Sequence, residues 1–445
     1  MSSDHAWAPL LPKVADPPID VIYLDLDRPE CAPDVEQTSL VLVRHGGFPR
    51  ASLVVEAGLG RGALLEAAQE AVDSLRSPSD RVESNRVPVT DADLTDAGLT
   101  DAGLTEAEVL DLTAGPGEVT VVITAIHDSP QLHQAIDWIC AQSLKPAEVI
   151  VVDNRPSTSG LREILASRTR PGVRYVAERR RGTSNARNAG LREVKTPLVA
   201  FADDDVRPDP DWLMHLVSGF ENASVTCVMG LIMPAELRTD AQVWMEQFGG
   251  FSKGFERVHI DAHHPEWAGP LHPYRVGIYG SGANAAFRTE SLRRIGGFDE
   301  DLGAGRPTRG GEDLDIFLRL VLAGDGIVYE PGALVWHRHV PEIEQFRMRV
   351  LGYGMGLSAV FTKHLMATRS ERVAILRRMH HAAHHMWSGK STKNASKGGS
   401  YPRWYSMLEL LGVVVGPPVY AWTRWRSRGD GANRRVVRTS RPDAT

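Results

Sequence analysis

The sequence predicts an α/β protein built on a parallel sheet with helices on both faces. Three observations support this prediction: continuous apolar strands alternate with amphipathic helices, the strands are short, and polar residues follow directly after them. The predicted strands are 119–124, 149–152, 173–177 and 198–202, and the predicted helices are 132–140 and 183–194. Ligands bind at the carboxyl ends of the strands in such sheets, so the residues after each strand are the candidates for a site.

The regions on either side differ in composition and predict further units. Residues 1–76 contain two strand-like runs and one helical segment, typical of a small α+β module. Residues 77–118 form an acidic linker with a five-residue repeat that matches neither helix nor strand. Residues 119–340 form the main domain, and 341–445 form a helical, basic extension.

Composition excludes several classes of protein. The 445 residues are 42% hydrophobic and 24% charged, as in an ordinary globular chain. The net charge of -6 argues against a nucleic-acid binder. Three scattered cysteines form neither a disulfide framework nor a zinc motif. We see no secretory signal in residues 1–20, so the expected location is cytoplasmic.

Carboxylates follow two of the predicted strands. Asp153 ends the second strand, and Asp203, Asp204 and Asp205 follow the fourth. Side chains alternate along an extended chain, so Asp203 and Asp205 point the same way. Two convergent carboxylates suit Mg²⁺ or Mn²⁺, with substrate phosphates completing the shell. The alternative is a solvated acidic turn, but the position at a strand end favours the metal site.

A basic and glycine-containing segment precedes the fourth strand. Gly182 to Ser184 can open a helix whose N-terminus attracts anions. Arg187 would then add a fixed positive charge beside a diphosphate. The neighbouring arginines 179–181 fit solvated surface better than a phosphate site.

A second acidic centre follows a loop of small residues, 280–286. Gly282 would let the backbone approach a ligand, and Asn284 would bind a sugar or a neighbouring side chain. Glu312 and Asp313 then open a predicted helix. Helical spacing places Asp313 on the buried face with Ile316 and Phe317, and Glu312 on the other face with Asp315 and Arg319. An inward carboxylate at a site mouth suits a general base, although acidic residues in a first turn also favour the helix dipole.

Two histidines end the last predicted strand of the main domain. His337 and His339 share one face by strand alternation. A single histidine there is more often structural, but the proposed carboxylate site makes His337 a candidate third metal ligand.

The order of these segments resembles the family 2 glycosyltransferases, over about Val119 to His339. The matching segments are Val151-Val152-Asp153-Asn154, Ala186-Arg187-Asn188-Ala189-Gly190, Asp203-Asp204-Asp205, Gly282-Ala283-Asn284, Gly297-Phe298-Asp299-Glu300, Gly311-Glu312-Asp313 and Trp336-His337. The resemblance implies the GT-A fold, a Rossmann-like mixed sheet for nucleotide-diphosphate sugars, and inversion at the anomeric carbon. The exit of the first strand, 124–128, departs from the Pro-containing sequence more usual in the family.

The resemblance also implies roles for the residues. Asp313 would be the catalytic base and Glu312 its support. Asp203, Asp205 and His337 would hold Mn²⁺ or Mg²⁺. The donor, a UDP-, GDP- or dTDP-linked sugar, would contact Asp153, Arg187, Asn188, Asp203, Asp204, Gly282 and Asn284. The acceptor would be a glycan or a lipid-linked hydroxyl, in cell-envelope glycolipid or polysaccharide synthesis.

The C-terminal extension suggests a membrane surface. Residues 401–425 are aromatic and apolar, but the apolar run within them is shorter than a membrane span, and arginines flank the segment up to 428. We expect either packing on the main domain or peripheral contact through 401–428 at the inner face of the membrane. The histidine cluster 380–385 is interpreted as a solvated helix face rather than a metal site, because no acidic partner accompanies it.

Two other functions compete with glycosyl transfer. A non-catalytic nucleotide-sugar binding module would lose the base or the metal residues, and both are present. A nucleotidyltransferase would carry a glycine-rich basic loop after the first strand, where this chain has Ala125-Ile126-His127-Asp128. The same position lacks the GxGxxG segment of a dinucleotide dehydrogenase.

Overall fold

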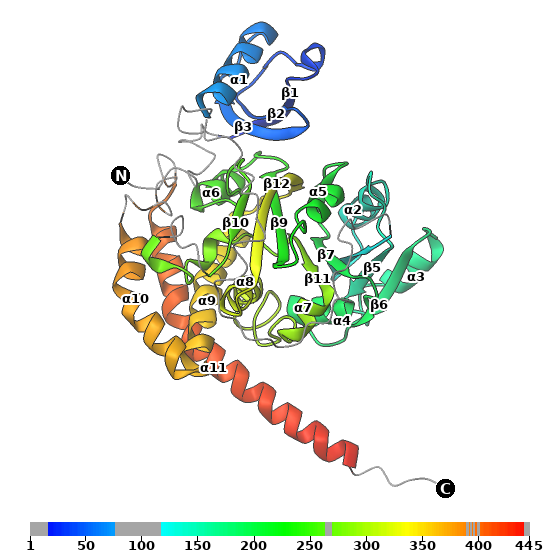
Figure 1. The fold of residues 1–445 in the computed structure, drawn as a ribbon, viewed down its shortest axis with the longest axis vertical. Coiled ribbons are helices and arrows are strands. Elements are labelled where there is room, and N and C mark those ends of the chain that lie inside the picture. Colours follow the sequence, from blue (N-terminus) through cyan, green and yellow to red (C-terminus); the bar gives the residue numbers. More distant parts are fainter. Residues whose placement is uncertain are drawn as a thin grey trace, which may run out of the picture.

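A nine-stranded mixed sheet forms the centre of the computed structural model (Figure 1). The structure describes residues 17–75, 117–262, 269–388, 391, 394, 397 and 401–439. The strand order is β10-β12-β9-β11-β7-β4-β5-β6, and β8 pairs with β12. The strands are β4 (Val119–Ala125), β5 (Glu148–Asp153), β6 (Val173–Ala177), β7 (Leu198–Asp203), β8 (Val206–Pro208), β9 (Val225–Pro234), β10 (Val258–Ile260), β11 (Asn284–Arg288) and β12 (Gly326–His337).

The predicted parallel arrangement holds for one half of this sheet. Strands β7, β4, β5 and β6 are parallel neighbours. The other half is mixed, because β11 runs antiparallel to both β7 and β9, whereas β12 runs parallel to β9. The last predicted strand of the main domain, which ends at the two histidines, belongs to β12, a strand with an irregularity between Glu330 and Val335.

Helices cover both faces of the sheet and bury its apolar strands. Helices α4, α8 and α9 (Ile343–Ala367) contribute to the core on one face, whereas α2 and α5 contribute to the core on the other. The helices of this domain are α2 (Pro130–Cys140), α3 (Leu161–Ser167), α4 (Thr183–Glu193), α5 (Trp212–Ser218), α6 (Asp240–Phe248), α7 (Thr289–Arg294) and α8 (Glu312–Leu322). This layered α/β arrangement is the one that the sequence predicts.

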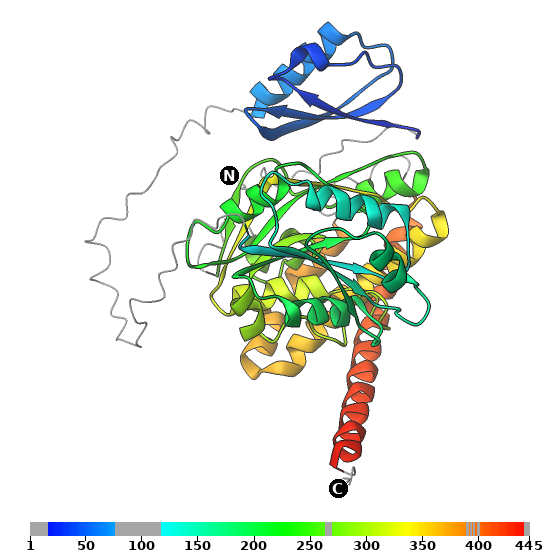
Figure 2. The ribbon, with the colours of Figure 1, turned by 90° about the vertical axis from the view of Figure 1, so that its right-hand side faces the viewer.

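The N-terminal module is a three-stranded sheet with one helix and lies against the main domain (Figure 2). It contains β1 (Asp20–Asp25), β2 (Ser39–His45), β3 (Phe48–Val55) and α1 (Arg61–Leu75). Leu40 and Leu42 pack with Leu231 and Met233 of β9. Arg44 forms ion pairs with Asp209 and Asp211 of the main domain. The α+β prediction is therefore confirmed, whereas nearly all of the predicted linker lies outside the described residues.

Three long helices form the C-terminal extension: α9 (Ile343–Ala367), α10 (Arg369–Trp387) and α11 (Trp404–Thr439). Helices α9 and α11 lie in close backbone contact. A Cβ atom on Gly354 of α9 would lie 2.1 Å from the carbonyl oxygen of Glu409. In the described part of the chain, no helix combines the length and the apolarity that a membrane crossing requires.

Candidate active site

The carboxyl ends of β7 and β12 bring three metal-ligating side chains together. Strand β12 pairs with β8 so that His337 lies opposite Val206, next to Asp205. One ligand atom each from Asp203, Asp205 and His337 lies within 4.8 Å of the others. His337 Nε2 is 3.6 Å from Asp205 Oδ1. The structure thus groups the three residues predicted as metal ligands.

The chemistry of this group fits a divalent cation. Burial lowers the pKa of His337, which favours the neutral imidazole that can bind a metal. Two carboxylates and one imidazole are a donor set that Mn²⁺ accepts well, and substrate phosphates can supply further oxygens. Among the described residues, this is the one group of at least three acidic, histidine or cysteine side chains with such spacing. The histidines of α10 do not form another.

Asp204 lies between the two carboxylate ligands. Burial raises its pKa to about 7, and the charges of Asp205 and Asp203 add to this shift. A cation held by these neighbours would oppose the shift by attraction. Its contact with the donor stays a prediction.

One buried arginine joins the metal group to the second acidic centre. Arg187 of α4 is 4% exposed, and its Nη2 atom lies 3.2 Å from Asp203 Oδ1. Its Nη1 atom lies 3.3 Å from Glu312 Oε1. Gly282 is required beside it, because a Cβ atom there would lie 2.7 Å from the Arg187 Nη1 atom. The sequence predicted a positive charge here but not that it links both centres.

The N-terminus of α8 holds the second acidic centre in a different orientation from the predicted one. Glu312 is buried, whereas Asp313 is half-exposed. The predicted facing of the two side chains was therefore wrong. The reason is that α9 covers α8: a Cβ atom on Gly311 would lie 2.6 Å from the carbonyl oxygen of Gly356 in α9. The helix therefore has no solvated face at Glu312.

The two carboxylates differ in their electrostatic environment. Burial raises the pKa of Glu312 to about 7, and the neighbouring Asp313 adds to the shift while Arg187 opposes it. Asp313 accepts hydrogen bonds from the backbone N–H groups of Gly282, at 3.1 Å, and Leu314, at 2.8 Å. These bonds orient a carboxylate that solvent can reach, which is the geometry a base requires.

Asn284 and Asn188 form hydrogen bonds within the protein. Asn284 is fully buried; its amide donates to the carbonyl oxygens of Leu231 and Ala333, and its oxygen accepts from Trp212 Nε1. Asn188 bonds the backbone N–H and carbonyl of Phe298. Long-range partners, which sequence spacing does not reveal, use these hydrogen-bonding groups, and the contact of both residues with the donor stays a prediction.

Asp153 and Asn154 organise the end of β5. Asp153 is fully buried and accepts from the Arg155 N–H and from the hydroxyls of Ser159 and Tyr175. Asn154 accepts from the N–H of Gly182, the residue before α4. Asp153 thus shapes this end of the sheet, and its contact with a nucleoside stays a prediction.

Lys253 was not predicted as part of the site. It lies on the loop after α6, two residues beyond Phe251, whose ring is 5.4 Å from that of His337. Burial lowers the pKa of Lys253 to about 8, against the opposing charges of Glu246 and Asp313. No motif marks this loop, so the sequence offered no signal for it.

Comparison with known proteins agrees with this geometry. Residues 120–296 match the model of the family described as Glycosyl transferase family 2. These residues form a glycosyltransferase family 2 domain. Together with the mixed sheet, the match confirms the predicted GT-A fold and disfavours the nucleotidyltransferase alternative.

The family 2 domain has curated relatives that share part of their length with this chain. The pre-mycofactocin glycosyltransferase of Mycobacterium tuberculosis is 28% identical over 258 residues, which are 56% of this chain and 49% of the relative. The glucosyl-dolichyl phosphate glucuronosyltransferase of Haloferax volcanii is 24% identical over 46% of this chain and 63% of the relative. The chain thus spans about half to two thirds of the length of these relatives.

A solved structure is also similar to this chain. It is a mannosyltransferase from Pyrobaculum calidifontis in complex with GDP-Man and Mn²⁺. The two are 21% identical with a TM-score of 0.45, over 71% of this chain and 86% of the other.

Proposed function

We propose that this chain is an inverting glycosyltransferase that moves a sugar from a nucleotide-diphosphate donor to an acceptor hydroxyl. The observation that carries the proposal is the link through Arg187, which holds the metal-ligating group and the Glu312–Asp313 pair beside one another. A donor whose diphosphate lies at the first centre would present its sugar to the second.

Each side chain then has a defined task. Asp203, Asp205 and His337 would hold Mn²⁺ or Mg²⁺, which when bound neutralises charge developing on the leaving diphosphate. Arg187 keeps a fixed positive charge beside Asp203 and Glu312. The backbone N–H of Gly282 orients Asp313, and Glu312 supports the site from its buried position.

The reaction is a direct displacement at the anomeric carbon. Asp313 takes the proton of the acceptor hydroxyl while that oxygen forms its bond to the carbon. The bond from the carbon to the phosphate oxygen breaks, and its electron pair leaves with the nucleoside diphosphate. Attack from the opposite side inverts the configuration. Positioning and preorganised charges supply most of the acceleration.

The acceptor that we propose is a glycan or a lipid-linked hydroxyl, in cell-envelope glycolipid or polysaccharide synthesis at the cytoplasmic face of a membrane. The name of the Haloferax relative, which includes a dolichyl phosphate, supports a lipid-linked acceptor. A non-catalytic binding module would not need the half-exposed, oriented carboxylate of Asp313.

Donor binding tests the proposal directly. The full chain is heated with UDP-, GDP- or dTDP-linked sugars, each with and without Mn²⁺. One donor at about 100 times its Kd should stabilise the chain by about 2.7 kcal/mol, and only with the metal present. Asp205→Asn should lose this stabilisation while unfolding normally without ligand. If no donor raises the Tm of the native chain, the proposal is wrong.

A further inference from the structure

The solvent-facing side of α11 is apolar, the reverse of an ordinary surface helix. Met407 and Val414 are each 71% exposed and Trp425 is 73% exposed. The exposed apolar residues recur every three or four positions, apart from one wider gap, along a single side of the helix. We call this side the outer face of α11; it consists of Trp404, Met407, Leu411, Val414, Trp422 and Trp425.

The opposite side of α11 is fixed to the body of the protein. Tyr405, Glu409 and Tyr420 are buried, and Glu409 pairs with Lys397 at 3.6 Å. A Cβ atom on Gly416 would lie 2.5 Å from the carbonyl oxygen of Met355 in α9, so the two helices touch along their backbones. Only one side of α11 is therefore open to a partner.

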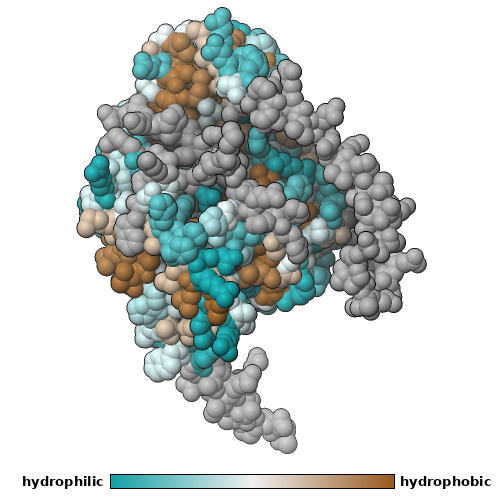
Figure 3. Space-filling model, turned by 60° about the vertical axis from the view of Figure 1, so that its left-hand side comes forward, coloured by the Kyte–Doolittle hydropathy of each residue, from teal (hydrophilic) through white to brown (hydrophobic). Residues whose placement is uncertain are grey.

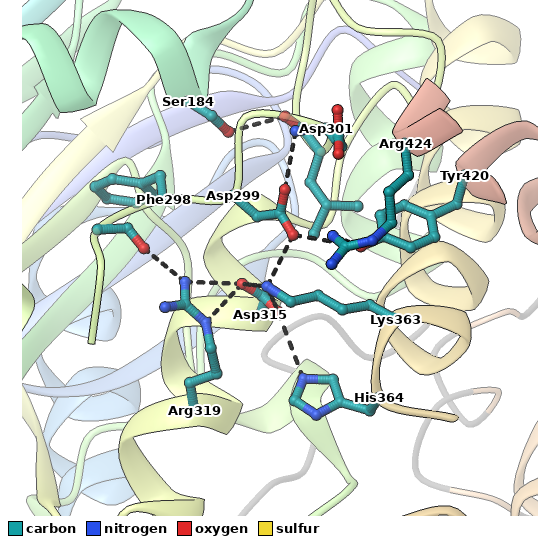
Figure 4. Close-up of polar contacts among 12 residues, drawn as sticks. Ser184, Phe298, Asp299, Asp301, Asp315, Arg319, Lys363, His364, Tyr420 and Arg424 are labelled. Atoms are coloured by element: carbon teal, nitrogen blue, oxygen red, sulfur yellow. Dashed lines mark hydrogen bonds and ion pairs between the residues drawn. The ribbon is translucent and has the colours of Figure 1, made fainter. Parts of the chain in front are cut away.

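Further hydrogen bonds attach the C-terminal part of this segment and the residues just after it (Figure 4). The Tyr420 hydroxyl donates to Asp299, and Arg424 donates to the Tyr420 hydroxyl. Ser427 donates to Asp301 at 2.6 Å. These bonds tie α11 to the loop that precedes α8 and its carboxylates. A partner on the outer face of α11 thus binds a rigid part of the molecule.

Aromatic and basic side chains mark both ends of the outer face of α11. The Arg347 guanidinium lies 4.9 Å from the Trp404 ring at one end, and that of Arg426 lies 5.4 Å from the Trp422 ring at the other. Arg403 and Arg428 are exposed beside them. Hydrophobic patches lie beside the end of α11 that leaves the body (Figure 3). Apolar residues between tryptophans and arginines complement an anionic lipid surface.

The packing of α11 on α9 limits the orientations in which α11 could bind a membrane. Residues 404–425 extend about 32 Å at 1.5 Å per residue, close to the thickness of a bilayer core. A spanning helix, however, would have to leave α9 and expose Glu409 to hydrocarbon. We infer that the outer face of α11 docks in the plane of an anionic membrane, with its apolar side chains below the headgroups. This surface lies outside the proposed catalytic site.

Vesicle sedimentation with the full chain tests the inference. The variant Met407→Glu/Val414→Glu places two charges on the outer face of α11. The control Met214→Glu/Leu322→Glu changes two residues that are exposed to about 40% elsewhere, on α5 and α8. The native chain and the control should sediment with phosphatidylglycerol vesicles. The Met407→Glu/Val414→Glu variant should bind at least tenfold more weakly, and thermal unfolding should show that all three chains are folded.

Two further measurements test the inference: vesicle binding with different lipids and salt concentrations, and the oligomeric state of the protein in solution. Native binding should fall severalfold in neutral phosphatidylcholine vesicles or in 0.5 M salt, because the arginines supply part of the attraction. The inference fails if the native chain does not sediment with anionic vesicles, or if both double variants bind equally. It also fails if light scattering shows a native dimer that Met407→Glu/Val414→Glu makes monomeric, because a second copy would then cover this face.

Discussion

Two buried carboxylates on helix α8 lie three residues apart and have opposite environments. Glu312 is 8% exposed and has one cationic partner, Arg187, which it shares with Asp203. Asp315 is fully buried among Lys363, Arg319 and His364 (Figure 4). The same helix thus carries one carboxylate with too little positive charge around it and another with ample charge.

The pKa values move in opposite directions as a result. Burial acts to raise the pKa of both groups. At Asp315 the contact with His364 and the charges of Arg319 and Lys363 outweigh burial and hold the pKa well below its usual value. At Glu312 burial and the adjacent Asp313 outweigh Arg187, so the pKa rises to about 7. A group whose charge is fully compensated inside the chain stabilises the fold, whereas an undercompensated group marks a functional site.

The strongest test of this distinction is Asp313→Asn in the functional centre. The variant keeps the shape of the side chain but cannot accept the acceptor's proton. We expect kcat to fall by roughly 10²–10⁴-fold, the usual contribution of a general base. Transfer of radiolabelled sugar measures the rate, and donor binding should change little. Normal turnover would remove Asp313 from this role.

Asp315→Asn should instead affect stability. Breaking a buried ion pair costs about 3–5 kcal/mol. We expect the lower end, about 3 kcal/mol, because Lys363 retains Asp299 and Arg319 retains two backbone carbonyls. Urea unfolding measures the loss. Below the melting transition, kcat should change far less than in Asp313→Asn, and a variant as stable as the native chain would contradict the assignment.

Asn284→Ala extends the comparison to an uncharged side chain that was first interpreted as binding the donor. The change leaves Trp212 Nε1 and the carbonyls of Leu231 and Ala333 without this partner. Each buried polar group left unpaired costs about 1–3 kcal/mol, so we expect the three groups together to cost at least about 3 kcal/mol. Isothermal titration should give an unchanged donor Kd; a large loss of donor affinity in a folded variant would restore the first interpretation.

These cases show what the sequence can and cannot predict. Strand periodicity placed the parallel half of the sheet, and the carboxylates at the end of β7 placed the metal-ligating group, because both depend on local pattern. The facing of Glu312 and the partners of Asn188 and Asn284 depend on segments distant in the sequence. The same holds for the link through Arg187. This side chain contacts Asp203, which lies 16 positions away in the sequence, and Glu312, which lies 125 positions away. Helical spacing predicts which side chains of α8 share a face. It does not predict that α9 covers the face that was expected to be exposed.

The last expected effect is a pH dependence that belongs to Glu312. In the unfolded chain this group loses its proton near pH 4.5, whereas in the folded chain it keeps the proton up to about pH 7. Between these values the folded state binds more protons, so the free energy of unfolding should fall as pH rises, by at most about 1.4 kcal/mol per pH unit. Below pH 4.5 and above pH 7 this contribution is constant.

Glu312→Gln isolates this contribution, because other groups that titrate in the same window, such as Asp204, remain in both chains. The difference in free energy of unfolding between the variant and the native chain should grow from pH 4.5 to pH 7 in favour of the variant. Asp315→Asn should show the opposite trend: the native advantage is lost as pH falls, since the folded pKa of Asp315 is depressed. Urea unfolding at several pH values measures both curves. Parallel curves for Glu312→Gln and the native chain would mean that Arg187 compensates Glu312 fully, and the difference between the two carboxylates of α8 would disappear.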